Sequence, residues 1–168
     1  QNVAGSILYE YGTSEQQEIA RRVIAGECMV AITVTEPEAG NDVASLKTEA
    51  VRDGDHWVLN GMKSFITLGG DADVLVTLAR VDRASGRNGM AFFAVDRRSP
   101  GVTTRQIETY VNRPAPTYRV TFDDVRVPEA RRVDAGFREI MAGFNRERVM
   151  VAARWLGHMQ NALNWARE

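Results

Sequence analysis

The sequence predicts an α+β fold in which an antiparallel β-barrel or β-sandwich lies between helices. Short runs of β-favouring residues, separated by turn residues, fill the chain from Cys28 to Val127, which is the pattern of small sandwiches and barrels. Apolar residues with helical spacing stand before and after this section. With 168 residues, of which 44% are hydrophobic and 26% charged, the chain has the composition of an ordinary globular protein.

A helix is predicted before the β section. Thr13 and Gln16 have the spacing of a capping box, and Ile19 and Val23 recur on one helical face. Gly26 follows as a typical helix-ending residue. We therefore expect one short amphipathic helix in this part of the chain.

Eight strands are predicted within the β section, at residues 29–35, 47–52, 56–59, 64–68, 74–81, 91–95, 102–107 and 118–122. Asp53-Gly54-Asp55 and Asn60-Gly61 are tight-turn sequences, and residues 84–89 form a longer polar loop. Short connections of this kind favour antiparallel hairpins over crossover helices.

Helical spacing returns after the β section. Apolar residues recur at intervals of three and four from about Gly136 to the end of the chain. Gly143 and Asn145 predict a break between a short helix and a long one that starts near Arg146. We expect three units: residues 1–27 as the end of a helical domain, 28–133 as the β-domain, and 134–168 as the start of a second helical domain.

Charge and cysteine content exclude several classes of function. The chain has 21 Lys and Arg against 22 Asp and Glu, a net charge of −1, which provides no long-range field for nucleic acid or for an acidic membrane. The single cysteine, Cys28, excludes an intrachain disulfide framework and a cysteine-based zinc site. With only His56 and His158 as imidazoles, we expect no metal site.

Neither a membrane span nor a leader is visible, because no apolar run approaches about 18 residues and no charged-then-apolar segment opens the sequence. We expect a cytoplasmic protein. The chain begins with Gln and ends within a predicted helix, so we also expect a fragment of a longer protein.

Two polar turn segments are candidates for chemistry. Residues 35–42 follow an apolar strand, and the backbone amides of such a turn can bind phosphate oxygens, with Thr35 and Asn41 adding hydrogen bonds and Gly40 allowing close approach. Phe65 and Thr67 share one sheet face, where a planar ring could contact the aromatic side chain and the hydroxyl. Taken singly, the first segment is better interpreted as an ordinary loop, and the second as a core Phe beside a solvent-facing Thr.

Taken jointly, the segments resemble motifs of the acyl-CoA dehydrogenases. AITVTEPEAGND, residues 31–42, is similar to the family's T-E-P-x-A-G-S-D motif, and NGMKSFIT, residues 60–67, is similar to its N-G-x-K-x-W-I-T motif. Further similarities, in the family's order, are YGTSEQQ at 11–17, FDDVRVP at 122–128 and Glu147-Arg148. The resemblance implies the central β-domain of that fold, flanked by helices of its N- and C-terminal helical domains.

The resemblance also implies FAD as the cofactor and an acyl-CoA thioester as the substrate, which is oxidised to the trans-2-enoyl-CoA by α-proton removal and β-hydride transfer to flavin N5. By motif match, Val34 and Thr35 contact the flavin's pyrimidine edge, and Gly40 and Asn41 lie near the pyrophosphate and the CoA arm. The remaining contacts come from the second motif, with Phe65 in place of the usual Trp, Ile66 beside it, and Thr67 facing N5.

For the catalytic base, the resemblance leaves two positions open. In most of the family it is a Glu of the carboxy-terminal bundle; in a subset it stands where Glu147 stands here. An ordinary solvated Glu in the first turn of a helix is the plain alternative. The resemblance places Asn145 and Arg148 with Asn41 on the substrate side, and Asn145 stands where the family often has Asp.

Two further departures concern the substrate side: Asn41 replaces the usual Ser, and Val111 stands where a turn Gly is common. The implied partners are an electron-transfer flavoprotein as acceptor and further copies of the chain, as a dimer or homotetramer. The alternatives are a flavin-dependent oxidase or monooxygenase on the same fold, a flavin-binding relative without turnover, and a plain antiparallel interaction domain.

Overall fold

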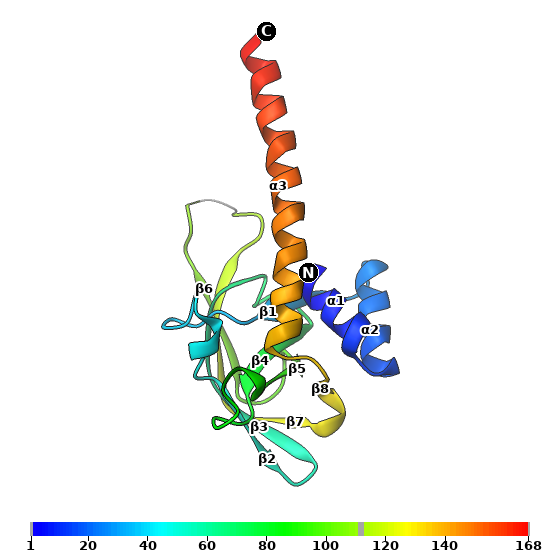
Figure 1. Ribbon diagram of the computed structural model, residues 1–168, viewed down its shortest axis with the longest axis vertical. Coiled ribbons are helices and arrows are strands. Elements are labelled where there is room, and N and C mark those ends of the chain that lie inside the picture. The colour runs from blue at the N-terminus through cyan, green and yellow to red at the C-terminus, as the bar shows by residue number, and fades with distance from the viewer. Residues whose placement is uncertain (1, 111–112, 168) are drawn as a thin grey trace.

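A single β-sheet with helices packed on one face forms the body of the molecule, and one long helix extends away from it (Figure 1). The computed structural model describes residues 2–110 and 113–167. The strands are β1 (Val30–Thr33), β2 (Glu49–Asp53), β3 (His56–Thr67), β4 (Val74–Arg80), β5 (Met90–Asp96), β6 (Val102–Ile107), β7 (Thr117–Pro128) and β8 (Arg132–Val133). The helices are α1 (Asn2–Tyr11), α2 (Ser14–Ile24) and α3 (Phe137–Arg167), with 3-10 turns η1 (Val43–Ser45), η2 (Gly86–Asn88) and η3 (Glu129–Arg131).

The sheet confirms the predicted fold class but corrects its pairing. Its order is β6-β7-β3-β2-β4-β5-β8, and β1 pairs with β4 beside this path. Most neighbours are antiparallel, as predicted, whereas β1 and β2 both run parallel to β4. Within the described residues the end strands β6 and β8 do not pair, so the sheet is not a closed barrel.

Strands β1 and β2 pair with different parts of β4, and a long loop connects them. Val30 to Thr33 of β1 lie opposite Val74 to Thr77, and Glu49 of β2 lies opposite Arg80 further along the same strand. The chain between β1 and β2 therefore leaves the edge of β4 and returns to it. This excursion carries the first of the two motif segments.

Strand β3 is continuous, which corrects the prediction of two strands separated by a turn at Asn60-Gly61. The Asn60 side chain exchanges two hydrogen bonds with Asp124 on β7, each of 2.9 Å. The register shifts between Leu59 and Gly61, and Gly61 has φ 146° and lies so close to Thr48 that a Cβ would come 2.7 Å from the Thr48 Cα atom. The Asn-Gly pair therefore forms a bulge, because long-range pairing with β7 continues on both sides of it.

The helices agree with the sequence in part. The Thr13–Gln16 capping box of α2 is confirmed, and Gly26 follows the helix with φ 78°. Helix α1 was not predicted. The predicted break in α3 is wrong: Gly143 lies inside one continuous helix, where a Cβ would come 3.1 Å from Val3 of α1, so the glycine allows the two helices to approach closely.

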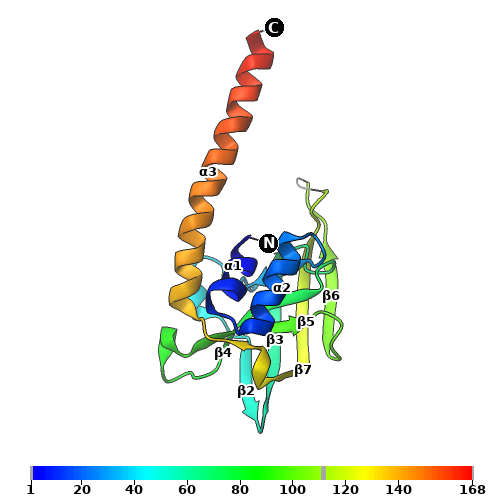
Figure 2. The ribbon, with the colours of Figure 1, turned by 90° about the vertical axis from the view of Figure 1, so that its right-hand side faces the viewer.

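Two apolar cores lie on opposite faces of the sheet. Neighbouring residues of β5 alternate between them: Phe92 packs in the core shared with the helices, and Phe93 packs in the other, where its ring lies 5.5 Å from that of Trp57. The first core includes Ile140 at the start of α3. Both views show the later part of α3 projecting beyond the sheet and the other helices (Figure 2).

Candidate functional site

The two motif segments lie side by side. The chain leaves β1 at Thr33, and the carbonyl oxygen of Thr35 accepts a 2.8 Å hydrogen bond from the backbone amide of Ser64 in β3. The first segment is thereby joined to the second through the backbone. This is the arrangement that the two segments need if they are to contact one ligand.

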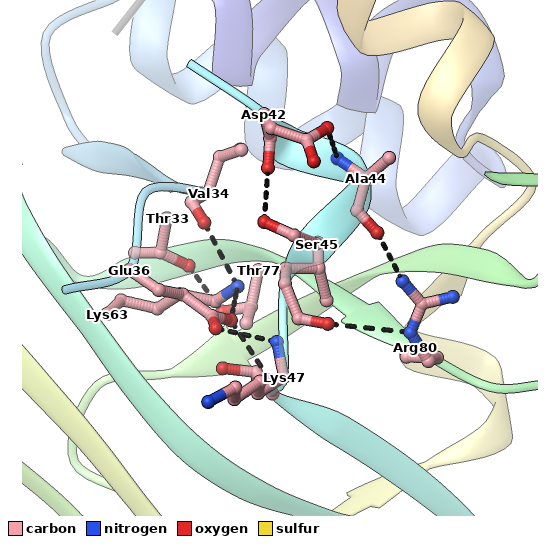
Figure 3. Close-up of polar contacts among 12 residues, drawn as sticks. Thr33, Val34, Glu36, Asp42, Ala44, Ser45, Lys47, Lys63, Thr77 and Arg80 are labelled. Atoms are coloured by element: carbon pink, nitrogen blue, oxygen red, sulfur yellow. Dashed lines mark hydrogen bonds and ion pairs between the residues drawn. The ribbon is translucent and has the colours of Figure 1, made fainter. Parts of the chain in front are cut away.

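A buried ion pair joins the same two segments through their side chains. The Lys63 ammonium lies 2.8 Å from the Glu36 carboxylate, and the side chains are 0% and 5% exposed. The ammonium also donates to the carbonyl oxygen of Val34 at 3.1 Å (Figure 3). Charged groups so deeply buried must be paired, because an unpaired charge in this setting costs several kcal/mol.

Glu36 also closes the loop that separates β1 from β2. Its carboxylate accepts hydrogen bonds from the backbone amides of Lys47, at 2.7 Å, and Thr48, at 3.0 Å. One carboxylate therefore holds both ends of the segment 37–46.

Burial and pairing act in opposite directions on these two groups. Burial lowers the pKa of Lys63 to about 8, although the Glu36 carboxylate opposes that shift. Burial raises the pKa of Glu36, but Lys63 and the Lys47 amide outweigh it, and the net pKa lies below the usual value. Both groups are thus charged near neutral pH.

Arg80 holds the far part of the same loop. Its guanidinium donates to the carbonyl oxygens of Ala44, at 2.7 Å, and Leu46, at 3.4 Å (Figure 3). The Asp42 carboxylate caps η1 by accepting from the Ala44 amide at 3.2 Å. Gly40 and Asn41, between these fixed points, are exposed.

The second segment presents an aromatic ring at the surface. Phe65 is 63% exposed and has a left-handed backbone with φ 57°, whereas Ile66 is 3% exposed and packs in the core with Trp57. Thr67 is exposed again, so Phe65 and Thr67 both face outward, as alternation predicts. The plain alternative of a core Phe is wrong. A non-glycine residue in this backbone region is uncommon, and such residues gather at ligand sites.

In the first segment, the candidate residues differ in access. The Val34 side chain is buried, at 3% exposure, in the core shared with the helices, which leaves its backbone as the group for polar contacts. Thr35 is half-buried. Its carbonyl oxygen accepts from Ser64, and its hydroxyl offers a further polar group for a ligand.

Glu147 lies on α3, apart from the two segments. It is half-buried and lines an open pocket with Phe144, Arg148, Val151 and Ala152. Because α3 begins at Phe137, Glu147 is well inside the helix, and the alternative of a first-turn Glu is wrong. Arg148 donates a 2.5 Å hydrogen bond to the side-chain oxygen of Asn145, so two predicted substrate-side residues contact each other.

Sequence reasoning did not identify the groups that hold this arrangement, namely Glu36, Lys63 and Arg80. A signal was present, since the first motif segment contains only acidic charged residues, Glu36, Glu38 and Asp42, and the second contains one basic residue, Lys63. Val111, predicted to alter a turn on the substrate side, lies outside the described residues.

Among residues 2–110 and 113–167 there is no cluster of metal-ligating side chains and no helix long and apolar enough to cross a bilayer.

Comparisons with known proteins agree with this arrangement. The profile of the family described as "Acyl-CoA dehydrogenase, middle domain" matches residues 31–125. The chain is 33% identical over 172 residues to the mitochondrial isobutyryl-CoA dehydrogenase of Dictyostelium discoideum, covering 99% of this chain and 41% of that protein.

Solved structures show the same fold. Butyryl-CoA dehydrogenase from Megasphaera elsdenii superposes with a TM-score of 0.88 at 29% identity, covering 93% of this chain and 42% of that one. A glutaryl-CoA dehydrogenase from Mycobacterium smegmatis in complex with FADH2 gives a TM-score of 0.76 at 32% identity, covering 84% and 36%. The chain thus spans about two fifths of the length of these relatives. It belongs to the acyl-CoA dehydrogenase family, of which it contains the middle domain.

Proposed function

We propose that this chain forms the FAD site and part of the active site of an enzyme that oxidises an acyl-CoA thioester to the trans-2-enoyl-CoA. The observation that carries the proposal is the junction of residues 34–36 with residues 63–64, made by the Thr35–Ser64 hydrogen bond and the buried Glu36–Lys63 pair. FADH2 in the related glutaryl-CoA dehydrogenase supports the choice of cofactor.

The residues at the junction fit such a cofactor. Phe65 offers an exposed ring on which a planar group can lie. Thr35 and Thr67 offer hydroxyls for its polar edge, with the backbone of Val34 and Ile66 beside them. Gly40 and Asn41 are exposed residues of a loop with both ends fixed, and the backbone amides of such a loop can bind phosphate oxygens.

When bound, FAD supplies the acceptor for the hydrogen that leaves the β-carbon with its electron pair. The chain's own contribution is to orient the thioester and to take the proton from its α-carbon. We assign the proton removal to the carboxylate of Glu147, and the binding of substrate to Asn41, Asn145 and Arg148. The Arg148 guanidinium donates to the side-chain oxygen of Asn145 one helical turn away, which joins two of the proposed substrate-binding groups.

The same proposal divides the chain into three parts. Residues 1–27 are the end of an N-terminal helical domain, 28–133 are the middle domain, and 134–168 begin a C-terminal helical domain. An electron-transfer flavoprotein as acceptor and a homotetramer stay predictions from the resemblance, and a cytoplasmic location stays a prediction from the sequence pattern.

The test uses the full-length protein reconstituted with FAD under argon. Acyl-CoAs of different chain length and branching are added, and the visible absorbance of the flavin is followed. We expect at least one thioester to bleach it and to yield an enoyl-CoA. Failure of every thioester with FAD retained would identify a flavin-binding relative without turnover, and rapid peroxide production in air would identify an oxidase.

A further inference from the structure

Burying the Glu36 and Lys63 charges costs more free energy than burying apolar side chains in the same place. Both side chains are removed from solvent, at 5% and 0% exposure, and apolar residues of similar volume in such places are often as stabilising as the ions they replace. A buried pair is therefore better explained by what it positions than by the stability it adds. Its hydrogen bonds show what it positions.

Three backbone groups from separate parts of the chain bond to this pair, and one backbone–backbone hydrogen bond lies beside it. Lys63 donates to the Val34 carbonyl, the carboxylate of Glu36 accepts from the amides of Lys47 and Thr48, and Ser64, next to Lys63, donates to Thr35. The end of β1, the return of the loop before β2 and the middle of β3 are thus held at fixed distances. Phe65 and Thr67 follow on β3, and Gly40 and Asn41 lie within the loop.

We propose that Glu36 and Lys63 are positioning residues that assemble the FAD-binding surface before the cofactor arrives. This inference rests on the proposed function. A preformed site reduces the conformational entropy that is lost when the ligand binds. Residues that hold the site in place can therefore raise the affinity without touching the ligand. Neither residue is assigned contact with substrate or cofactor.

The main test is the neutral pair Glu36→Gln/Lys63→Met in the full-length apoprotein. Gln keeps a side-chain oxygen for the loop amides, and Met keeps most of the volume of Lys, whereas the charged hydrogen bonds are lost. Because the loop amides and the Val34 carbonyl lose their charged partners, we expect FAD to bind at least about tenfold more weakly. The midpoint potential of the bound flavin should also shift, because the hydrogen-bond donors around it move relative to the ring.

The matched control is Asp53→Asn/Arg126→Met. This pair joins β2 to β7 at 2.6 Å, with both side chains more than half exposed, and exposed pairs contribute little. We expect its FAD affinity and flavin potential to equal those of the parent protein. An unchanged affinity and potential in the E36Q/K63M protein would overturn the inference.

A measurement on the unaltered protein keeps the inference testable if E36Q/K63M does not fold. Hydrogen exchange of the Lys47, Thr48 and Ser64 amides is compared in the apoprotein and after FAD addition. We expect all three to be protected without FAD, to the same order as the core amides of β3. Fast exchange that slows only when FAD is added would show that the cofactor assembles the site, and would overturn the inference. A parent protein that binds no FAD would instead defeat the proposed function.

Discussion

The amide of Ser64 donates a 2.8 Å hydrogen bond to the carbonyl oxygen of Thr35, which joins two polar segments that are well separated in the sequence. The contact uses backbone atoms only, so it leaves the Thr35 hydroxyl unused. Thr35 is half-buried and Thr67 is exposed on the same strand as Ser64. Their hydroxyls are the groups that we propose for the polar edge of the flavin.

The first prediction concerns these hydroxyls. Thr35→Val and Thr67→Val each remove one hydrogen bond while keeping a β-branched side chain of similar size. A net loss of about 0.5–1.5 kcal/mol per hydrogen bond predicts FAD binding weaker by about twofold to thirteenfold, measured by quenching of flavin fluorescence. Thr103→Val, at an exposed position on β6, is the control and should bind FAD normally. Equal affinity in all three variants would contradict the assignment.

The second prediction separates the ring of Phe65 from its backbone. Phe65→Gly and Phe65→Ala both remove the exposed ring, and both should weaken FAD binding to the same degree. Only Gly adopts φ 57° without strain, and the left-handed conformation costs other residues about 1–2 kcal/mol. The thermal midpoint of F65G should therefore exceed that of F65A. If the two midpoints coincide, the left-handed conformation at this position stores no strain.

The third prediction concerns Glu147. Glu147→Gln keeps size and hydrogen bonding but removes the base, and general bases contribute about a hundredfold to ten-thousandfold to rate. We expect turnover of the acyl-CoA to fall by at least about a hundredfold while FAD stays bound. Glu18→Gln on α2, exposed and remote from the pocket, should leave turnover unchanged. Retained turnover in E147Q would place the base beyond Glu168, in the carboxy-terminal bundle.

Local signals predicted much of the fold. The Thr13–Gln16 capping box and the alternation around Ile66 are set by neighbouring residues, and both are present in the structure. The turn predicted at Asn60-Gly61 was wrong. These residues locally favour a tight turn, but pairing with β7 on both sides of them keeps the strand continuous. Gly143 misled for a related reason: its lack of a side chain serves packing against Val3 rather than helix termination.

Local sequence patterns could not predict which distant segments pair in the sheet. The parallel contacts of β1 and β2 with β4 depend on a loop that leaves one strand edge and returns to it, and no residue pattern states this. The candidate site was found through its motifs, but the Glu36–Lys63 pair was not. Charged residues in a sequence are ordinarily exposed, and only the assembled fold shows that these two meet in the interior.

The last prediction is a pH dependence of stability caused by this pair. The folded pKa of Lys63, about 8, lies below its ordinary value of 10.5 because of burial. Between these two pH values the unfolded chain binds more protons than the folded chain, so the free energy of unfolding should rise with pH.

Glu36 changes the free energy of unfolding at acidic pH. Its folded pKa is below the ordinary 4.5, so the stability that it contributes above pH 4.5 is lost as pH falls through the folded value.

Urea unfolding of the full-length apoprotein across this pH range, compared with E36Q/K63M, isolates both effects because the double variant has neither titrating group. The difference in unfolding free energy, parent minus variant, should decrease on acidification below about pH 4.5 and increase above about pH 8. Between these limits it should be flat. D53N/R126M serves again as the control, since its groups are exposed and screened. A difference that is constant at all pH values would show that Glu36 and Lys63 do not titrate as a buried pair.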